Sequence, residues 1–201
     1  MNAVLLHLGW SLVLAWLGVF VAQTWKWGRG STMGLAVLCA LGAWWPGPNG
    51  ASYWLGLAFQ TPSLLTMLLC AWNIGQVLRS SDFEQRNKAG HSWVLLALPV
   101  MTGWVLLLDT FAVLPGSLYA LGTAPAGIAF AGGLTCLAWV MPREGGRRNP
   151  VPFFGSITVV FFAITRMPTG NVWDAVLDPL LWLVLNFLLL QRFVTRYKKR
   201  S

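Results

Sequence analysis

Long apolar runs separated by short polar gaps make up the whole chain, and this pattern predicts an all-α protein of membrane-spanning helices. A helix crosses the hydrocarbon core with about 20 apolar residues, within a usable range of roughly 17–25. The candidate runs are residues 3–25, 32–45, 53–78, 93–115, 117–141, 151–167 and 176–193. We therefore expect a polytopic bundle of about seven transmembrane helices, forming a single domain over residues 1–201.

Two of these runs, 32–45 and 151–167, are short for a full crossing. If both are re-entrant, the chain has five spans instead of seven. We favour seven spans, because the alternation of the basic gaps then follows directly from the crossings.

The Lys and Arg residues lie in alternate gaps, with Arg166 as the exception. Short loops rich in Lys and Arg remain on the cytoplasmic side of a membrane. The sequence therefore predicts a multi-pass protein of the inner membrane with its N-terminus outside and its C-terminus cytoplasmic. The cytoplasmic cations are Lys26, Arg29, Arg79, Arg86, Lys88, Arg143, Arg147, Arg148, Arg192, Arg196, Lys198, Lys199 and Arg200.

Composition agrees with this architecture. The 201 residues are 56% hydrophobic and only 10% charged, which is too apolar for a water-soluble core of this size. The first expected partner is therefore the lipid bilayer. The net charge of +8 is assigned to cytoplasmic segments, and the basic C-terminal tail is expected to contact anionic lipid headgroups. We do not expect nucleic-acid binding, because no basic stripe is interleaved with aromatics on a soluble domain.

The outer turns resemble one another. In each, a proline is followed by an aromatic residue and then by a second proline, as in Pro115, Tyr119 and Pro125. The same order recurs at Pro168, Trp173 and Pro179, and more loosely at Pro48, Tyr53 and Pro62. One initial helix followed by three related hairpins would explain this order, as would the general preference of outer turns for Pro, Gly and a boundary aromatic.

Small residues crowd the run at 117–141, and they allow close contact between helices. Packing within the chain or a homo-oligomer or other membrane-protein interface would each account for them. They are Gly122, Ala126, Gly127, Ala129, Ala131, Gly132 and Gly133.

Ionisable residues gather at the predicted outer ends of the spans. These candidate ligand-binding residues are Asp109, Arg166, Asp174 and Asp178. Such groups are costly at the membrane boundary unless paired or hydrated, so we expect Arg166 to pair with at least one of the aspartates. Asn171 with Asp174 also has the pattern of a helix N-cap followed by an acidic first turn. Asp178, directly before Pro179, is the stronger candidate for binding a cation or proton.

Two further polar residues, Gln60 and Asn186, are candidates for a substrate path, although a helix-to-helix hydrogen bond is the usual role for such residues. The chain has no nucleophile–base set, zinc motif or phosphate loop, and the sequence indicates no metal and no particular cofactor.

The function that the sequence favours is binding or conduction, as a transporter, channel or membrane subunit of a transport or envelope complex. An accessory subunit without a site of its own is the alternative. An outer-leaflet lipid-modifying enzyme with Asp109, Asp174 or Asp178 as base is less favoured, because no nucleophile accompanies the carboxylates.

Overall fold

The computed structural model describes residues 3–79, 93–140 and 150–198, and this part of the chain is helical without a strand. The predicted all-α class is confirmed. The chain forms two compact units, unit 1 from Met1 to Lys88 and unit 2 from Ala89 to Ser201. The single domain inferred from the pattern stays a prediction. The predicted cations at 86, 88, 143, 147, 148, 199 and 200, and the side chains at 196 and 198, lie outside the described residues.

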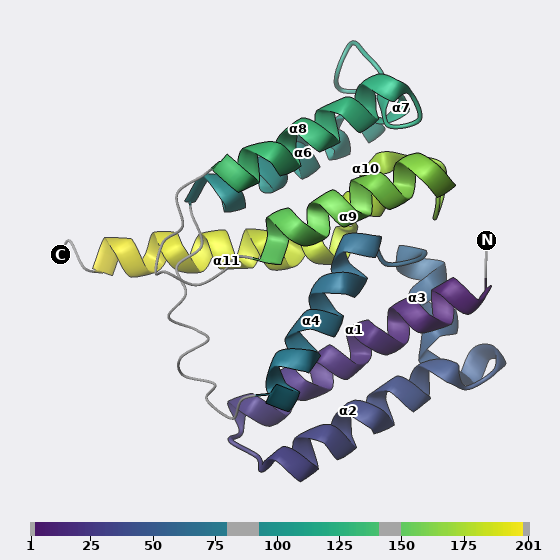
Figure 1. Cartoon of the computed structure of the whole chain (residues 1–201), viewed down its shortest axis with the longest axis vertical. Coiled ribbons are helices and arrows are strands. Elements are labelled where there is room, and N and C mark those ends of the chain that lie inside the picture. Colours follow the sequence, from purple (N-terminus) through teal and green to yellow (C-terminus); the bar gives the residue numbers. More distant parts are fainter. Residues whose placement is uncertain (1–2, 80–92, 141–149, 199–201) are drawn as a thin grey trace. The chain divides into compact units, whose positions relative to one another are not determined.

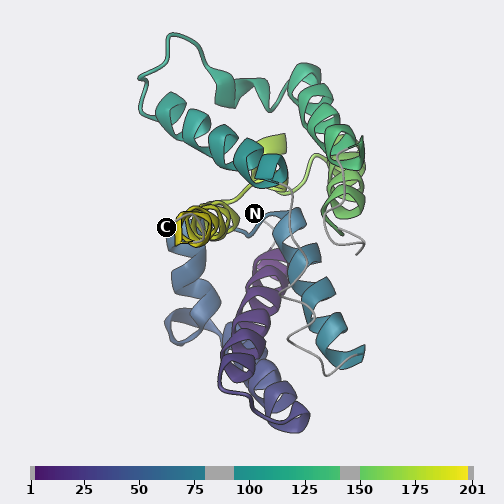
Figure 2. The same ribbon diagram turned by 90° about the vertical axis from the view of Figure 1, so that its left-hand side faces the viewer.

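Unit 1 is organised around its first helix. Its elements are α1 (Ala3–Thr24), α2 (Arg29–Trp44), the 3-10 helix η1 (Gly47–Asn49), α3 (Ala51–Phe59) and α4 (Leu64–Arg79). Helix α1 lies beside both α2 and α4 (Figures 1 and 2). The long helices of unit 1 therefore pack on α1.

Glycines on α1 allow these close contacts. A Cβ atom on Gly9 would lie 2.7 Å from Cε of Met67 in α4, and one on Gly18 would lie 3.0 Å from Sγ of Cys39 in α2. Small residues at contact points are typical of helices that pack in lipid, where apolar burial gives no driving force. Further along, a core cluster joins the three helices through Ala15, Val19, Ala36 and Val77.

Helix α1 is the one described helix that is long and apolar enough to cross a membrane. Its 22 residues span about 33 Å, close to the roughly 30 Å of a bilayer core.

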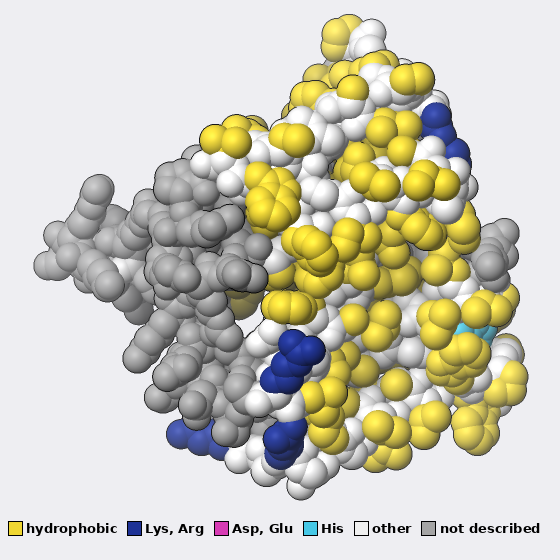
Figure 3. All heavy atoms as spheres, in the orientation of Figure 1, with side chains coloured by type: hydrophobic (Ala, Val, Ile, Leu, Met, Phe, Trp, Pro, Cys, Tyr) yellow, Lys and Arg dark blue, Asp and Glu magenta, His cyan; other side chains and the backbone are white. Residues whose placement is uncertain are grey.

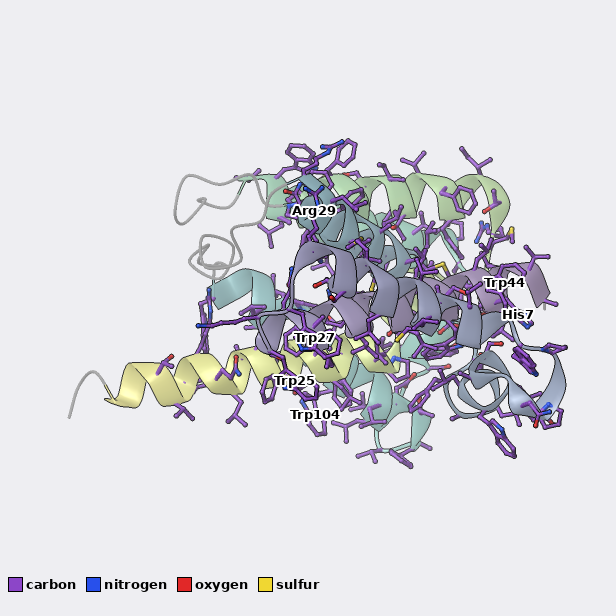
Figure 4. The ribbon with its side chains drawn as sticks, turned by 90° about the horizontal axis from the view of Figure 1, so that it is seen from below. His7, Trp25, Trp27, Arg29, Trp44 and Trp104 are labelled. Carbon is purple, nitrogen blue, oxygen red and sulfur yellow. The ribbon has the colours of Figure 1, made fainter. Side chains whose placement is uncertain are left out.

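The two ends of unit 1 differ in charge. His7 and Trp44 lie in ring contact at one end of the α1–α2 pair, and Trp25 and Trp27 lie at the other (Figure 4). Lysine and arginine side chains gather at this second end, where α1 and α4 end and α2 begins (Figure 3).

The described part of unit 2 contains four long helices and two short ones. They are α6 (Trp93–Thr110), α7 (Leu118–Leu121), α8 (Pro125–Val140), α9 (Pro150–Thr165), α10 (Val172–Val176) and α11 (Pro179–Lys198). Helix α8 packs on α9, and α6 packs on α11. Where α8 packs on α9, the side chain of Thr135 lies against Gly155. Where α6 packs on α11, the ring of Trp182 lies against Gly103. The core of unit 2 comprises Ala131, Val159, Phe162, Val172, Trp173 and Ala175.

Several predicted runs are divided or shortened by the structure. The run 53–78 is two helices, because Gln60 has a positive φ of 60° and Pro62 cannot donate a backbone hydrogen bond. In the run 117–141, α8 begins only at Pro125, and the short α7 precedes it. The run 93–115 is helical only to Thr110. These interruptions all fall near the predicted outer ends of the spans.

A similar order of elements occurs three times in the described residues, with the 3-10 helix η1 as an extra element in the first set. A long helix leads into a short helix, a break follows, and another long helix begins at or just after a proline. The three sets are α2–α3–α4, α6–α7–α8 and α9–α10–α11, and the prolines are Pro62, Pro125 and Pro179. The hypothesis of three related hairpins thus gains support from the order of the helices.

Candidate functional site

Two of the predicted outer turns, both in unit 2, are joined by hydrogen bonds that run between segments about 50 residues apart. The backbone N–H of Val172 donates to the carbonyl of Gly122 at 2.9 Å, and Nδ2 of Asn171 donates to the carbonyl of Tyr119 at 2.9 Å. We call residues 109–123 and 166–178 the outer junction. Helices α7 and α10 accordingly lie at the same end of unit 2 (Figure 1).

Tyr119 connects two of the predicted aspartates. Its backbone N–H donates to Oδ2 of Asp109 at 2.6 Å. Its phenol hydroxyl donates to Asp174, at 2.9 Å from Oδ1 and 2.8 Å from Oδ2. Thr169 donates a second hydroxyl to Asp174. Partial burial, and then the hydrogen bond and negative charge of Asp174, raise the pKa of Tyr119 to about 12.

Only one of the two carboxylate oxygens of Asp109 accepts a hydrogen bond from the described residues. Its Oδ1 is buried and has no hydrogen-bond partner among the described residues, whereas Oδ2 accepts from Tyr119. Asp109 also lies in the last turn of α6, where the helix dipole disfavours a negative charge. A buried acceptor in this position is costly unless another group binds it.

Arg166 does not form the expected ion pair with an aspartate. Its Nη1 donates instead to the carbonyl of Thr123 at 3.0 Å, and its guanidinium lies 5.7 Å from the ring centre of Phe162. Two hydroxyl groups already occupy the carboxylate of Asp174, and the carbonyl of Thr123 offers Arg166 an acceptor on the opposite turn. Arg166 therefore joins the two turns without neutralising a carboxylate.

The predicted N-cap at Asn171 is confirmed. Its Oδ1 accepts from the backbone N–H of Trp173 at 3.0 Å, and Asp174 lies in the first turn of α10. Asp178 acts in the same way at the next helix, because its Oδ1 accepts from the backbone N–H of Leu181 at 2.7 Å. Asp178 is only 6% exposed. The structure thus gives it a capping role that the sequence analysis did not assign.

Neither Gln60 nor Asn186 belongs to the outer junction as defined by residues 109–123 and 166–178. Gln60 ends α3 in unit 1, and its backbone carbonyl accepts from Nε1 of Trp10 at 2.9 Å. Asn186 lies midway along α11 and accepts from Nε1 of Trp104 on α6 at 3.3 Å, which is the helix-to-helix bond usual for such a residue. A shallow groove beside it is lined by Asn186, Phe187, Leu189, Leu190 and Phe193.

Sequence reasoning missed the central role of Tyr119 and the contribution of Thr169. The recurring proline and aromatic positions marked Tyr119 only as a boundary residue, and nothing in the sequence singled out Thr169. Gly122 was assigned to helix packing, yet a Cβ atom there would lie 1.9 Å from Oδ1 of Asn171. This glycine is what allows the two turns to approach.

The outer junction offers one free carboxylate oxygen, and a single carboxylate suits one proton or one monovalent cation. In residues 3–79, 93–140 and 150–198, His, Cys, Asp and Glu form no group of three or more that could hold a metal ion. Comparison of the chain with protein-family models, curated proteins and solved structures finds no match.

Proposed function

We propose that this chain is a multi-pass protein of the inner membrane that binds or conducts a small cation through Asp109. The N-terminus is outside and the C-terminus cytoplasmic in this proposal, with about seven crossings. The length of α1 supports the membrane setting, as does the gathering of cations at one end of unit 1.

The observation that carries the binding function is the buried, unpartnered Oδ1 of Asp109. A carboxyl group in a partly dry position is stabilised either by a proton or by a bound cation. Such groups mark ion pathways in membrane proteins. Tyr119 fixes the carboxylate through its backbone N–H, so the spare oxygen is held in place before any ion arrives.

Flux through reconstituted vesicles tests the role of Asp109. The wild-type protein is reconstituted, and entry of protons and of Na⁺ is followed with trapped dyes under an imposed potential. Asp109→Asn keeps the size of the side chain and removes its charge, so we expect it to abolish flux of the conducted ion. Asp178→Asn is the matched control, because asparagine caps a helix as well as aspartate does.

Equal flux in wild type and Asp109→Asn would contradict this proposal, and so would loss of flux only in Asp178→Asn. In either case, an accessory subunit without its own site becomes the better interpretation.

Single-cysteine labelling tests the orientation separately. In a variant without Cys39, Cys70 and Cys136, cysteines at positions 50, 117 and 170 should react with an impermeant thiol reagent added outside. A reporter fused after Ser201 should be active only in the cytoplasm. Labelling of position 146 from outside would contradict the proposed topology.

A further inference from the structure

The connection between α1 and α2 is a closed turn that displays a lysine between two tryptophans. The backbone N–H of Trp27 donates to the carbonyl of Ala22 at 2.9 Å, and that of Lys26 donates to Gln23 at 3.1 Å. These bonds form the helix-ending motif in which the residue after the C-cap adopts a left-handed conformation. Lys26 occupies that position with a φ of 55°. Glycine is favoured there, because it has no Cβ atom.

Both neighbouring indoles are exposed. Trp25 is 67% exposed and Trp27 is 44% exposed, and their ring centres lie 5.7 Å apart at an angle of 56°. Figure 4 shows the two rings together at the end of α1. Exposed tryptophans at a helix end favour the boundary between the lipid headgroups and the acyl chains.

The charge at this end has no acidic counterpart in the described part of unit 1. Lys26 is exposed in the turn and Arg29 is exposed at the start of α2, and residues 3–79 contain no Asp or Glu. Figure 3 shows the basic side chains at this end of the unit. An anionic partner would therefore meet a positive field without a competing carboxylate from these residues.

We infer that Trp25, Lys26, Trp27 and Arg29 form a binding site for the headgroup of an anionic phospholipid in the inner leaflet. Lys26 and Arg29 bind the phosphate, and the two indoles contact the glycerol region and the first methylene groups. A free phosphate ion would contact only Lys26 and Arg29. A phospholipid has both a phosphate for the two cations and an acyl chain for the two indoles. The inference rests on the proposed membrane orientation but not on ion conduction by Asp109.

Calorimetric titration of the detergent-solubilised full chain with short-chain phosphatidylglycerol tests this site. We expect saturable binding that short-chain phosphatidylcholine and inorganic phosphate do not reproduce. Replacing both cations, with Lys26→Gly and Arg29→Gln, should weaken binding about thirty-fold, the loss expected for two cations at a membrane surface. Trp25→Leu with Trp27→Leu should also weaken binding, although both cations remain.

Lys26→Gly separates binding from folding. Glycine suits the left-handed position better than lysine, so this variant should melt at the same or a higher temperature while binding phosphatidylglycerol more weakly. The charge-matched control is Arg147→Gln with Arg148→Gln, which removes two cations from another predicted cytoplasmic segment and should leave the titration unchanged.

Equal loss of binding in the Arg147→Gln with Arg148→Gln variant would overturn the site, as would equal binding of phosphatidylcholine or inorganic phosphate. Asp109→Asn should bind the lipid as the wild type does. A failure of ion conduction is therefore distinguishable from a failure of the lipid site.

Discussion

The phenol hydroxyl of Tyr119 donates to both carboxylate oxygens of Asp174, which lies 55 residues further along the chain. Because the backbone N–H of Tyr119 binds Asp109 and its carbonyl accepts from Asn171, one residue connects three polar side chains. The outer junction thus depends on Tyr119 more than on any ion pair.

We expect Tyr119→Phe to destabilise unit 2 by about 1 kcal/mol, because it removes a hydrogen bond to a charged acceptor at a partly exposed position. The loss should shrink when Asp174 is already replaced by Asn, since the two changes act on one interaction. Thermal unfolding of the four proteins of this cycle in detergent measures the coupling. Strictly additive losses would show that the bond contributes nothing.

The raised pKa of Tyr119 predicts a contribution to stability that disappears at high pH. The neutral phenol donates to Asp174, and the folded-state pKa of about 12 lies above the ordinary value of 10.0. Its contribution is therefore fully present below pH 10 and is lost as the pH rises from about 10 through 12. Ultraviolet titration of tyrosinate should show a late step that Tyr119→Phe lacks. Ionisation of every tyrosine near pH 10 would contradict this assignment.

Gly122→Ala should be among the most damaging conservative changes in unit 2. The added Cβ would lie 1.9 Å from Oδ1 of Asn171 and 2.5 Å from Cδ1 of Trp173, so the turns must separate. We expect a loss of about 3 kcal/mol, at the upper end of the usual range for overpacking. Gly133→Ala is the control, because nothing lies within 4 Å of its added Cβ and alanine favours helices. Calorimetric melting temperatures distinguish the two variants.

Replacement of Arg166 should have a modest and independent effect. Arg166→Ala removes a hydrogen bond to the carbonyl of Thr123, which we expect to lower stability by about 1 kcal/mol. Because Arg166 forms no ion pair with Asp109 or Asp174 in the described structure, double replacement with either should be nearly additive. Rescue of Arg166→Ala by Asp174→Asn in thermal unfolding would instead indicate a hidden charge pair.

Asp178 should behave as a helix cap. Asp178→Ala is expected to cost about 1 kcal/mol of stability, since the N–H of Leu181 loses its acceptor, whereas Asp178→Asn should cost only a few tenths. Unfolding of both variants in a graded denaturing detergent provides the comparison. Equal destabilisation by Ala and Asn would point to a role for the charge itself.

Local signals in the sequence predicted the helices and the Asn171 cap, because apolar runs and capping residues act over a few positions. The runs also placed Asp109, Asp174 and Asp178 at the ends of helices, and the outer position of these ends stays a prediction. The break at Gln60 was missed, although Gln60, Thr61, Pro62 and Ser63 interrupt the apolar run, because the apolar residues on both sides were counted as one span.

The partners of Arg166 and Tyr119 could not be predicted in the same way. Each bonds to a group on a different outer turn, 43 residues away for Arg166 and 55 for Tyr119. Charge alone suggested an aspartate for Arg166, but a backbone carbonyl also accepts from a guanidinium when the geometry brings the two close. Such choices depend on how the turns meet, which hydrophobic pattern does not specify.

The pairing of α6 with α11 has a consequence for synthesis. In unit 1, α2 and α4 pack on a helix that has already been made, so each contact can form as soon as the later helix emerges. In unit 2, Nε1 of Trp182 donates to the carbonyl of Val100, 82 residues earlier in the chain. Until Trp182 is translated, the surface of α6 at Gly103 that receives its ring stays without this partner. A nascent chain stopped before Trp182 should therefore carry a complete unit 1 and an α6 that lacks its contact with the ring of Trp182 on α11.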